Sequence, residues 1–257
     1  MQSVLMEKNE HLGIITLNRP KSLNAMNADL VEEFHRALDI FVEDEDVRVI
    51  ILTGAGRAFC AGGDLGYLES LNDDKKRKAF IERVGEMTLK LRNCAKPVIG
   101  MINGVTAGAG VNLMLACDIV CSSEDAKFIQ SFVNVGLVPD CGGMYLLKET
   151  VGLQKAKELM FTADVISAQE AEKLKMVMHV YTKEDLKIET EKIAQKIAQG
   201  APMVIMYMKK MLNKSYANLK DFLDEEALVQ TFCLGTEDCK EGILAFKQKR
   251  QPNFQGK

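Results

Sequence analysis

The stretch VIGMINGVTAGAGVNLMLACDIVCSSEDAKFIQSFVNVGLVPDCGG, residues 98–143, combines glycine-rich turns, apolar runs and one well-placed acidic residue. It opens with an apolar, strand-like run that ends at Gly104, and the small residues 106–110 then lead into a helical pattern. A strand that passes through a glycine-rich turn into a helix leaves backbone N–H groups unpaired, and the helix dipole favours negative charge there. The stretch therefore predicts an anion site without a charged side chain.

Asp140 is the acidic residue of this stretch. It follows Pro139, precedes two glycines, and stands at the expected mouth of a helix beginning near Met144. Because its neighbours Leu137 and Val138 are apolar, we expect the carboxylate to be partly desolvated, which would raise its pKa and make it a better base. The alternative is that Asp140 only caps the helix that follows, since aspartate is a favoured capping residue.

A second glycine-rich turn lies upstream, in GAGRAFCAGGDL at residues 54–65. It follows the apolar run 47–53, which has the pattern of a strand buried on both faces. Before it come a strand at 11–17, closed by Pro20, and a helix that Asn27 caps and that runs to about Phe41.

The remainder of the chain is mostly helical in pattern. Helical spacing marks residues 73–93, 142–151 and 153–162, and Ser167 with Glu170 has the spacing of a capping box. A methionine-rich segment at about 202–216 is more typical of an adaptable core than of ligand binding. Strands early and helices late predict an α/β core at residues 1–195 and a helical region at 196–257.

The composition excludes several classes of function. With a formal net charge of -3 and scattered basic residues, the 257-residue chain lacks the footprint of a nucleic-acid-binding protein. Seven cysteines without C-x-x-C spacing and three distant histidines predict no metal site. No apolar run reaches about 18 residues and no signal sequence is apparent, so we expect no membrane association and a reduced, cytoplasmic protein.

The two glycine-rich turns, AFCAGGDL and INGVTAGAGVNL, each follow a strand and can each direct one backbone N–H at the same oxygen. Neither has the pattern of a dinucleotide site or a P-loop. Two converging amides suit a thioester whose carbonyl oxygen becomes an enolate, and such donors contribute about 3 to 4 kcal/mol each in other oxyanion holes.

With these motifs the chain resembles the crotonase, or enoyl-CoA hydratase/isomerase, superfamily. The resemblance covers nearly the whole chain, in order: LNRPKSLNAM, VRVIILTGAGRAFCAGGDL, KPVIGMINGVTAGAGVNLMLACDIV, AKFIQSFVNVGLVPDCGG and EGILAFKQKRQPNF. It implies a repeated ββα spiral core, a C-terminal helical region used in trimer formation, and assembly as a homotrimer or a hexamer built as a dimer of trimers. It also implies an acyl-CoA thioester as substrate, with coenzyme A as part of the substrate and no separate cofactor.

The resemblance also assigns residues. It implies that the amides of Ala61 and Ala109 form the oxyanion hole, and that Phe246 and Lys249 reach coenzyme A from a neighbouring subunit. The residues that it places along the coenzyme A pocket are Lys21, Ser22, Leu23, Ala61, Gly62, Gly63, Asp64 and Leu65.

The reaction depends on which acids and bases face the hole. The two glutamates that hold water in the family's hydratases are matched here by Asn112 and Phe132, neither of which can take a proton at neutral pH. Asp140 in GLVPDCGG resembles the catalytic aspartate of the isomerases of phenylacetate degradation, and the C-terminal sequence is similar to that branch. Our hypothesis is double-bond isomerisation, in which Asp140 moves a proton while Phe132 and Asn112 shape and dry the pocket.

Three other functions stay open from the sequence. One is a hydratase, or lyase, that uses Asp140 alone to activate water. The second is a dehalogenase of aryl thioesters with Asp140 as nucleophile, although that site has a tryptophan where this chain has Phe132. The third is an acyl-CoA binder without activity.

Four residues also have simpler interpretations. Asn112 can bind either substrate or a neighbouring carbonyl, whereas Asp64 can merely satisfy loop amides. We expect Cys141 to fill a small buried space and His35 to be solvated on a charged helix face.

Overall fold

The computed structural model describes residues 2–257, so residue 1 of the predicted core domain lies outside it. Its larger sheet has six strands in the order β1-β2-β3-β5-β7-β10, in which only the β1–β2 pair is antiparallel. The strands are β1 Val4–Asn9, β2 Leu12–Leu17, β3 Val49–Gly54, β5 Val98–Ile102, β7 Ile119–Ser123 and β10 His179–Tyr181.

A smaller sheet of four strands has the order β4-β6-β8-β9, and its β8–β9 pair is antiparallel. These strands are β4 Ala58–Cys60, β6 Val105–Ala107, β8 Lys127–Ile129 and β9 Ile166–Ser167. Along the chain, a strand of the larger sheet is followed by a strand of the smaller sheet and then by helix. The pairs β3–β4, β5–β6 and β7–β8 repeat this order. The predicted ββα repeat of the α/β core is therefore confirmed.

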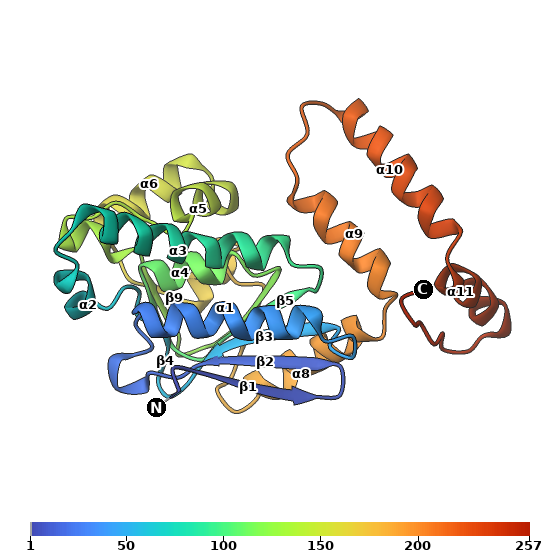
Figure 1. The fold of residues 1–257 in the computed structure, drawn as a ribbon, viewed down its shortest axis with the longest axis horizontal. Coiled ribbons are helices and arrows are strands. Elements are labelled where there is room, and N and C mark those ends of the chain that lie inside the picture. The colour runs from blue at the N-terminus through green and yellow to red at the C-terminus, as the bar shows by residue number, and fades with distance from the viewer. Residues whose placement is uncertain (1) are drawn as a thin grey trace.

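The two faces of the larger sheet are covered by different helices (Figure 1). Ile50 and Leu52 of β3 join the main core, which includes residues of α1 (Ala28–Glu43) and α3 (Asp74–Asn93). Val49 and Ile51 point to the opposite face and pack with residues of α8 (Leu186–Ala198). Alternate residues thus serve opposite faces, as the period of a strand requires, and β3 is buried on both sides as its sequence predicts.

The other helices lie around the smaller sheet or in the C-terminal region. They are α2 Leu65–Ser70, α4 Ala109–Leu115, α5 Gly143–Val151, α6 Leu153–Thr162, α7 Ala168–Lys173, α9 Pro202–Asn213, α10 Leu219–Leu234 and α11 Glu237–Gln248, with short 3-10 turns η1 Pro20–Ser22 and η2 Ser131–Val135. Over residues 2–257, no helix combines the length and apolarity needed to cross a membrane.

Helix starts follow the predicted capping residues. The Asn27 side chain accepts a hydrogen bond from the N–H of Leu30, and that of Ser167 accepts from Glu170. The prediction for His35 is wrong, because this side chain is buried between α1 and α3 with its Nε2 3.0 Å from the carbonyl oxygen of Arg83. Its apolar helix face, rather than its charged neighbours, decides its position.

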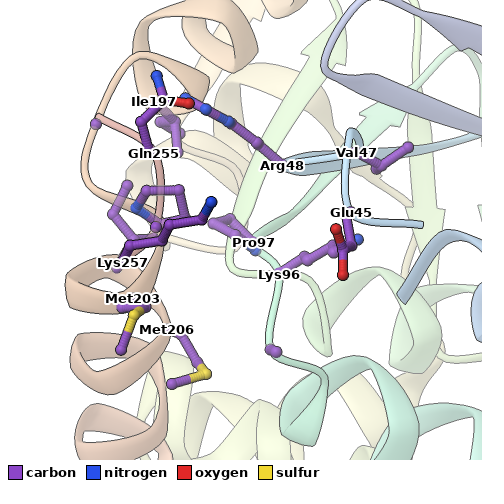
Figure 2. Close-up of a pocket in the computed structure, with 15 residues that line it drawn as sticks. Glu45, Val47, Arg48, Lys96, Pro97, Ile197, Met203, Met206, Gln255 and Lys257 are labelled. Carbon is purple, nitrogen blue, oxygen red and sulfur yellow. The ribbon is translucent and has the colours of Figure 1, made fainter. Parts of the chain in front are cut away.

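Helices α9 to α11 form an arm that extends away from the two sheets (Figure 1). The arm is held by Lys209 of α9, whose Nζ pairs with Asp118 at 2.7 Å and donates to the carbonyls of Leu91 and Lys96. Arg48 adds bonds to the carbonyls of Ala198 and Phe254, beside a cavity of about 360 Å³ at this joint (Figure 2). The predicted boundary at residues 195 and 196 falls inside α8, which packs on the sheet, and the arm itself begins with α9.

Candidate active site

The structure brings the two glycine-rich turns into direct contact. A Cβ added at Gly110 would lie 2.2 Å from the carbonyl oxygen of Cys60, so only glycine allows α4 to approach the first turn this closely. Gly62 has φ +92°, and a Cβ there would lie 3.0 Å from the carbonyl oxygen of Ala107. The two turns therefore present their backbones to the same space.

The first amide of the expected oxyanion hole must be reassigned. Ala61 donates its N–H to the carbonyl of Leu23 at 2.9 Å, so this group is not free for a substrate, contrary to the prediction. Met26 forms backbone hydrogen bonds on both sides of Gly63. Its N–H donates to the carbonyl of Gly62, and its carbonyl accepts from the N–H of Asp64. Within residues 2–257 the Gly63 N–H has no acceptor, which makes it the available donor of this turn.

The second amide that the sequence predicts for the hole, that of Ala109, lies at the start of α4. Ala109 is the first residue of α4, so its N–H has no partner in the helix, and nothing else in residues 2–257 accepts from it. α4 has seven residues, all of them buried. Both Gly63 and Ala109 line one cavity of about 500 Å³.

This cavity is lined by backbone groups and by mainly apolar side chains. The backbone groups come from the two turns, and the side chains come from α2, α3, η2 and the segments that follow α2 and η2. The lining residues are Ala61, Gly62, Gly63, Leu65, Leu68, Leu71, Arg77, Ile81, Gly108, Ala109, Ser131, Phe132, Asn134, Val135, Leu137 and Asp140. A mainly apolar cavity of this volume, with a few convergent polar groups, is typical of a small-molecule site.

Asp140 is the one carboxylate among the residues that line the cavity within the described chain. Its Oδ1 is buried and has no hydrogen-bond partner in residues 2–257. Burial raises the pKa of Asp140 to about 6, since a carboxylate loses hydration there. Asp140 is not the cap of α5, because the capping residue is Gly142 and no side chain bonds the helix start.

The two positions that match hydratase glutamates differ in placement. Phe132 lies in the cavity wall, whereas Asn112 is fully buried behind it. The Asn112 amide donates from Nδ2 to the carbonyl oxygen of Asp140 at 2.8 Å and accepts from Gln130 Nε2 at 2.7 Å. Of the two interpretations of Asn112, the geometry supports the neighbouring carbonyl.

Most other residues assigned to the coenzyme A pocket form the loop beside it. Lys21 and Ser22 are exposed on η1, and Leu23 holds the first turn through its carbonyl. Asp64 caps α2 by accepting from Tyr67, and it pairs with Arg19 at 2.9 Å. These bonds fix the loop against the rim of the cavity.

Phe246 and Lys249 lie on or just after α11, which is far from α2 in a single chain (Figure 1), and α2 lines the cavity. Phe246 is 86% exposed. Their contact with coenzyme A from a neighbouring subunit stays a prediction.

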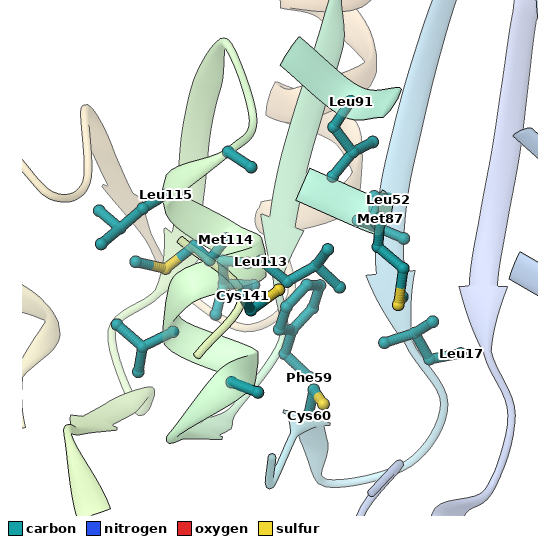
Figure 3. Close-up of a cluster of buried hydrophobic side chains, with 14 of the residues drawn as sticks. Leu17, Leu52, Phe59, Cys60, Met87, Leu91, Leu113, Met114, Leu115 and Cys141 are labelled. Atoms are coloured by element: carbon teal, nitrogen blue, oxygen red, sulfur yellow. The ribbon is translucent and has the colours of Figure 1, made fainter. Parts of the chain in front are cut away.

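Cys141 occupies the position beside the proposed base but is not available as a nucleophile. It is buried, its Sγ lies 3.0 Å from Thr88 Oγ1, and desolvation raises the pKa of its thiol to about 12. Figure 3 shows Cys141 among the core side chains, near Leu113 and Phe59. It is therefore the buried filler that its apolar surroundings predict.

Sequence reasoning missed the part of the lining that α2 and α3 supply. Leu68 and Leu71 lie in a segment without a clear pattern, and the helical spacing at 73–93 did not show that Arg77 and Ile81 face the cavity. The role of Gly63 was also missed, because the pairing of the first turn with the distant Met26 is not visible in the local sequence.

Two free amides in one cavity, an isolated carboxylate and a mainly apolar lining suit an enzyme of acyl thioesters with an α/β spiral fold. Residues 7–257 match the family model described as enoyl-CoA hydratase/isomerase, and the chain belongs to this family of crotonase-type enzymes. The family acts on coenzyme A thioesters and typically needs no separate cofactor.

Individual relatives are similar over nearly their whole length. A probable mitochondrial enoyl-CoA hydratase of Dictyostelium discoideum is 38% identical over 98% of this chain and 90% of its own. The 1,2-epoxyphenylacetyl-CoA isomerase of Escherichia coli K12 is 34% identical over 100% of both chains. The crystal structure of an enoyl-CoA hydratase from Bacillus anthracis superposes with a TM-score of 0.95 at 33% identity and covers 100% of both chains.

Proposed function

We propose that this enzyme isomerises the double bond of an enoyl-CoA thioester, with Asp140 as its single acid–base group. The observation that carries the proposal is the place of Asp140 in the cavity wall, where it is the one acid among the lining residues of the described chain. Its partial burial supports the role, because a base with a pKa of about 6 is ionised at neutral pH yet more basic than an ordinary aspartate.

The backbone amides of Gly63 and Ala109 bind the thioester oxygen in this mechanism. As negative charge moves onto that oxygen, the two N–H groups stabilise it and the hydrogen on the acyl chain becomes acidic. Asp140 takes this proton from one carbon, the electron pair moves into the enolate, and Asp140 returns the proton to another carbon of the same chain. No atom is gained or lost, so one base is sufficient.

Hydration through Asp140 alone is the competing reaction, and it is favoured by the hydratase names of many relatives. Addition of water would need a site that holds the water molecule. The positions of the two hydratase glutamates are taken by an apolar ring and by an amide already bonded on both sides. These occupants support isomerisation over hydration.

The deciding experiment is incubation with 2-enoyl-CoA and 3-enoyl-CoA in deuterium oxide. Isomerisation places deuterium at the α and γ carbons and interconverts the two substrates without forming a 3-hydroxyacyl product. Net formation of that product, lost in Asp140→Asn, would instead support the hydratase.

The substrate class is proposed to be that of the phenylacetate-degrading isomerases. Support comes from the GLVPDCGG segment around Asp140, and from 34% identity to the Escherichia coli epoxyphenylacetyl-CoA isomerase. A comparison of aryl-acyl and straight-chain enoyl-CoA substrates tests this assignment against a role in fatty acid metabolism.

The pH profile should report Asp140. Because burial raises its pKa to about 6, we expect kcat/KM to fall about tenfold per pH unit below pH 6, where the base becomes protonated. An unshifted aspartate would place this limb near pH 4, since its ordinary pKa is about 3.9. A limb near pH 4 in the wild-type enzyme would contradict the desolvated base.

We also propose that the arm pairs with copies of the same chain, as a trimer or a dimer of trimers. Within residues 2–257 of one chain, α10 buries none of its residues, and large apolar side chains such as Leu228, at 73% exposure, face outward. An apolar surface of this kind on a helix needs a partner.

A charged arm should therefore lose its partners. We expect Leu228→Asp with Phe232→Asp to shift the protein to a monomer in analytical ultracentrifugation. Activity at low substrate concentration should fall if Phe246 serves a neighbouring site. Ile40→Asp, at an exposed apolar residue of α1, is the control and should leave the assembly unchanged. A monomeric wild-type protein at micromolar concentration would refute the proposal.

A further inference from the structure

The carbonyl oxygen of Asp140 is held by two hydrogen bonds. One comes from Asn112 Nδ2 at 2.8 Å and the other from the N–H of Gly143 at 2.9 Å. The side chain of Asp140 has an unpartnered Oδ1, so no bond at that oxygen fixes its direction within residues 2–257. The position of the carboxylate consequently depends on how its backbone is fixed.

The Asp140 carbonyl fixes which way the Asn112 amide faces, because a carbonyl only accepts hydrogen bonds, and the other end of that amide is bonded by Gln130. The Gln130 Nε2 donates to Asn112 Oδ1 at 2.7 Å, and both side chains are buried. Since the amide nitrogen must point to the Asp140 carbonyl, the amide oxygen faces Gln130, whose own Oε1 is buried without a partner within residues 2–257. The chain Gln130–Asn112–Asp140 is thus directional.

Gly143 allows this arrangement at the start of α5. A Cβ at Gly143 would lie 2.2 Å from Asn112 Cγ, so the helix packs directly against the amide group. The segment between η2 and α5 is therefore held at Asp140 from two sides, by α4 and by the first turn of α5.

We infer that Asn112 is a positioning residue, which aims the Asp140 carboxylate at the substrate by holding its backbone, while Gln130 bonds the far end of the Asn112 amide. This inference rests on the proposed role of Asp140. Asn112, which occupies the position of a hydratase glutamate, then positions the base Asp140 rather than a water molecule. A displacement of about 1 Å in such a group is enough to cost about 100-fold in rate.

Two substitutions test the direction of the chain. Asn112→Leu removes both bonds with little change of volume, and we expect kcat to fall about 10- to 100-fold with KM nearly unchanged. Gln130→Glu leaves Asn112 in place but offers an acceptor where a donor stood. Repulsion between that acceptor and Asn112 Oδ1 should loosen the hold of Asn112 on the Asp140 carbonyl, and we expect kcat to fall by no more than in Asn112→Leu.

The pH profile separates positioning from packing. A carboxylate released toward solvent recovers hydration, so the acid limb of kcat should move to lower pH in both variants. The matched control is Asn213→Leu, since half-buried Asn213 also donates from its Nδ2 to a backbone carbonyl, that of Arg92 at the end of α3, outside the cavity lining. This control substitution should lower the stability of the protein without moving the acid limb of the kcat profile.

An NMR titration of the Asp140 carboxyl carbon in the substrate-free protein gives a readout independent of the reaction. A lower pKa in Asn112→Leu than in wild type supports positioning even if Asp140→Asn proves fully active, an outcome that would sink the proposed function alone. An unchanged titration and unchanged kcat in folded Asn112→Leu would overturn the inference. If that variant does not fold, Gln130→Glu and Gln130→Met decide by the same two measurements.

Discussion

Replacing Asp140 by asparagine should abolish isomerisation while the protein still binds enoyl-CoA. Asparagine has nearly the same shape but cannot accept a proton at neutral pH, and loss of a general base costs about 10²- to 10⁴-fold in rate. Because the amides of Gly63 and Ala109 stay in place, Kd for the thioester should change little. Single-turnover kinetics and calorimetric titration with a 3-enoyl-CoA measure the two effects separately.

The same substitution should stabilise the fold at pH 7. The folded state raises the pKa of Asp140 from 3.8 to about 6, so it binds the proton more tightly than the unfolded chain. The free energy of unfolding is therefore highest below pH 4, where Asp140 is protonated in both states. It falls between pH 4 and pH 6, and at pH 7 it is lower by up to about 3 kcal/mol. The neutral amide of Asp140→Asn avoids this cost.

Thermal unfolding at two pH values checks the sign. The melting temperature of Asp140→Asn should exceed that of wild type at pH 7, and the difference should vanish near pH 4. Asp125→Asn, at an exposed carboxylate, serves as the control for the loss of a charge. If the variant melted at a lower temperature than wild type at pH 7, burial would not be destabilising the ionised Asp140 carboxylate.

Proline at position 109 should remove one donor of the oxyanion hole. Ala109 is the first residue of α4, a position where proline suits the helix, and its ring replaces the free N–H. Loss of one such donor lowers kcat by about 10²- to 10³-fold in comparable sites. The added ring also occupies space beside Gly62, since a Cβ at Gly62 would lie 3.4 Å from Ala109 N.

The same substitution in α1 provides a matched control. Ala28 is likewise the first residue of its helix, and Asn27 before it is extended, which proline tolerates. Ala28→Pro should leave kcat unchanged while showing what proline does to a helix start. If Ala109→Pro were as active as wild type, the thioester oxygen would have to bind elsewhere.

The parts of the fold visible in sequence are those set by local chemistry. The burial of β3 on both faces follows from its continuous apolar run, and the starts of α1 and α7 follow from Asn27 and Ser167. The glycine-rich turns also identify where the two backbones meet. Each of these depends on neighbours within a few residues.

The parts that were missed depend on distant partners. Which amide of the first turn is free is decided by Leu23 and Met26, which lie far upstream of the groups they bind. His35 is buried because α3 covers it, although its neighbours in sequence are charged. The burial of Asn112 behind Asp140 likewise depends on Gln130 and Gly143, which no local pattern connects to it.

The two helices α2 and α4 line the same cavity but differ in how easily they can move. α2 has no fully buried residue, is fixed at its start by Asp64 and packs on the core through half-buried Tyr67 and Leu68, whereas α4 is buried throughout. α2 can therefore shift outward at a smaller cost in packing energy than α4, because fewer of its contacts lie in the core. The enzyme should therefore accommodate acyl tails of different bulk, while the geometry at the reacting carbons stays constant from one substrate to the next.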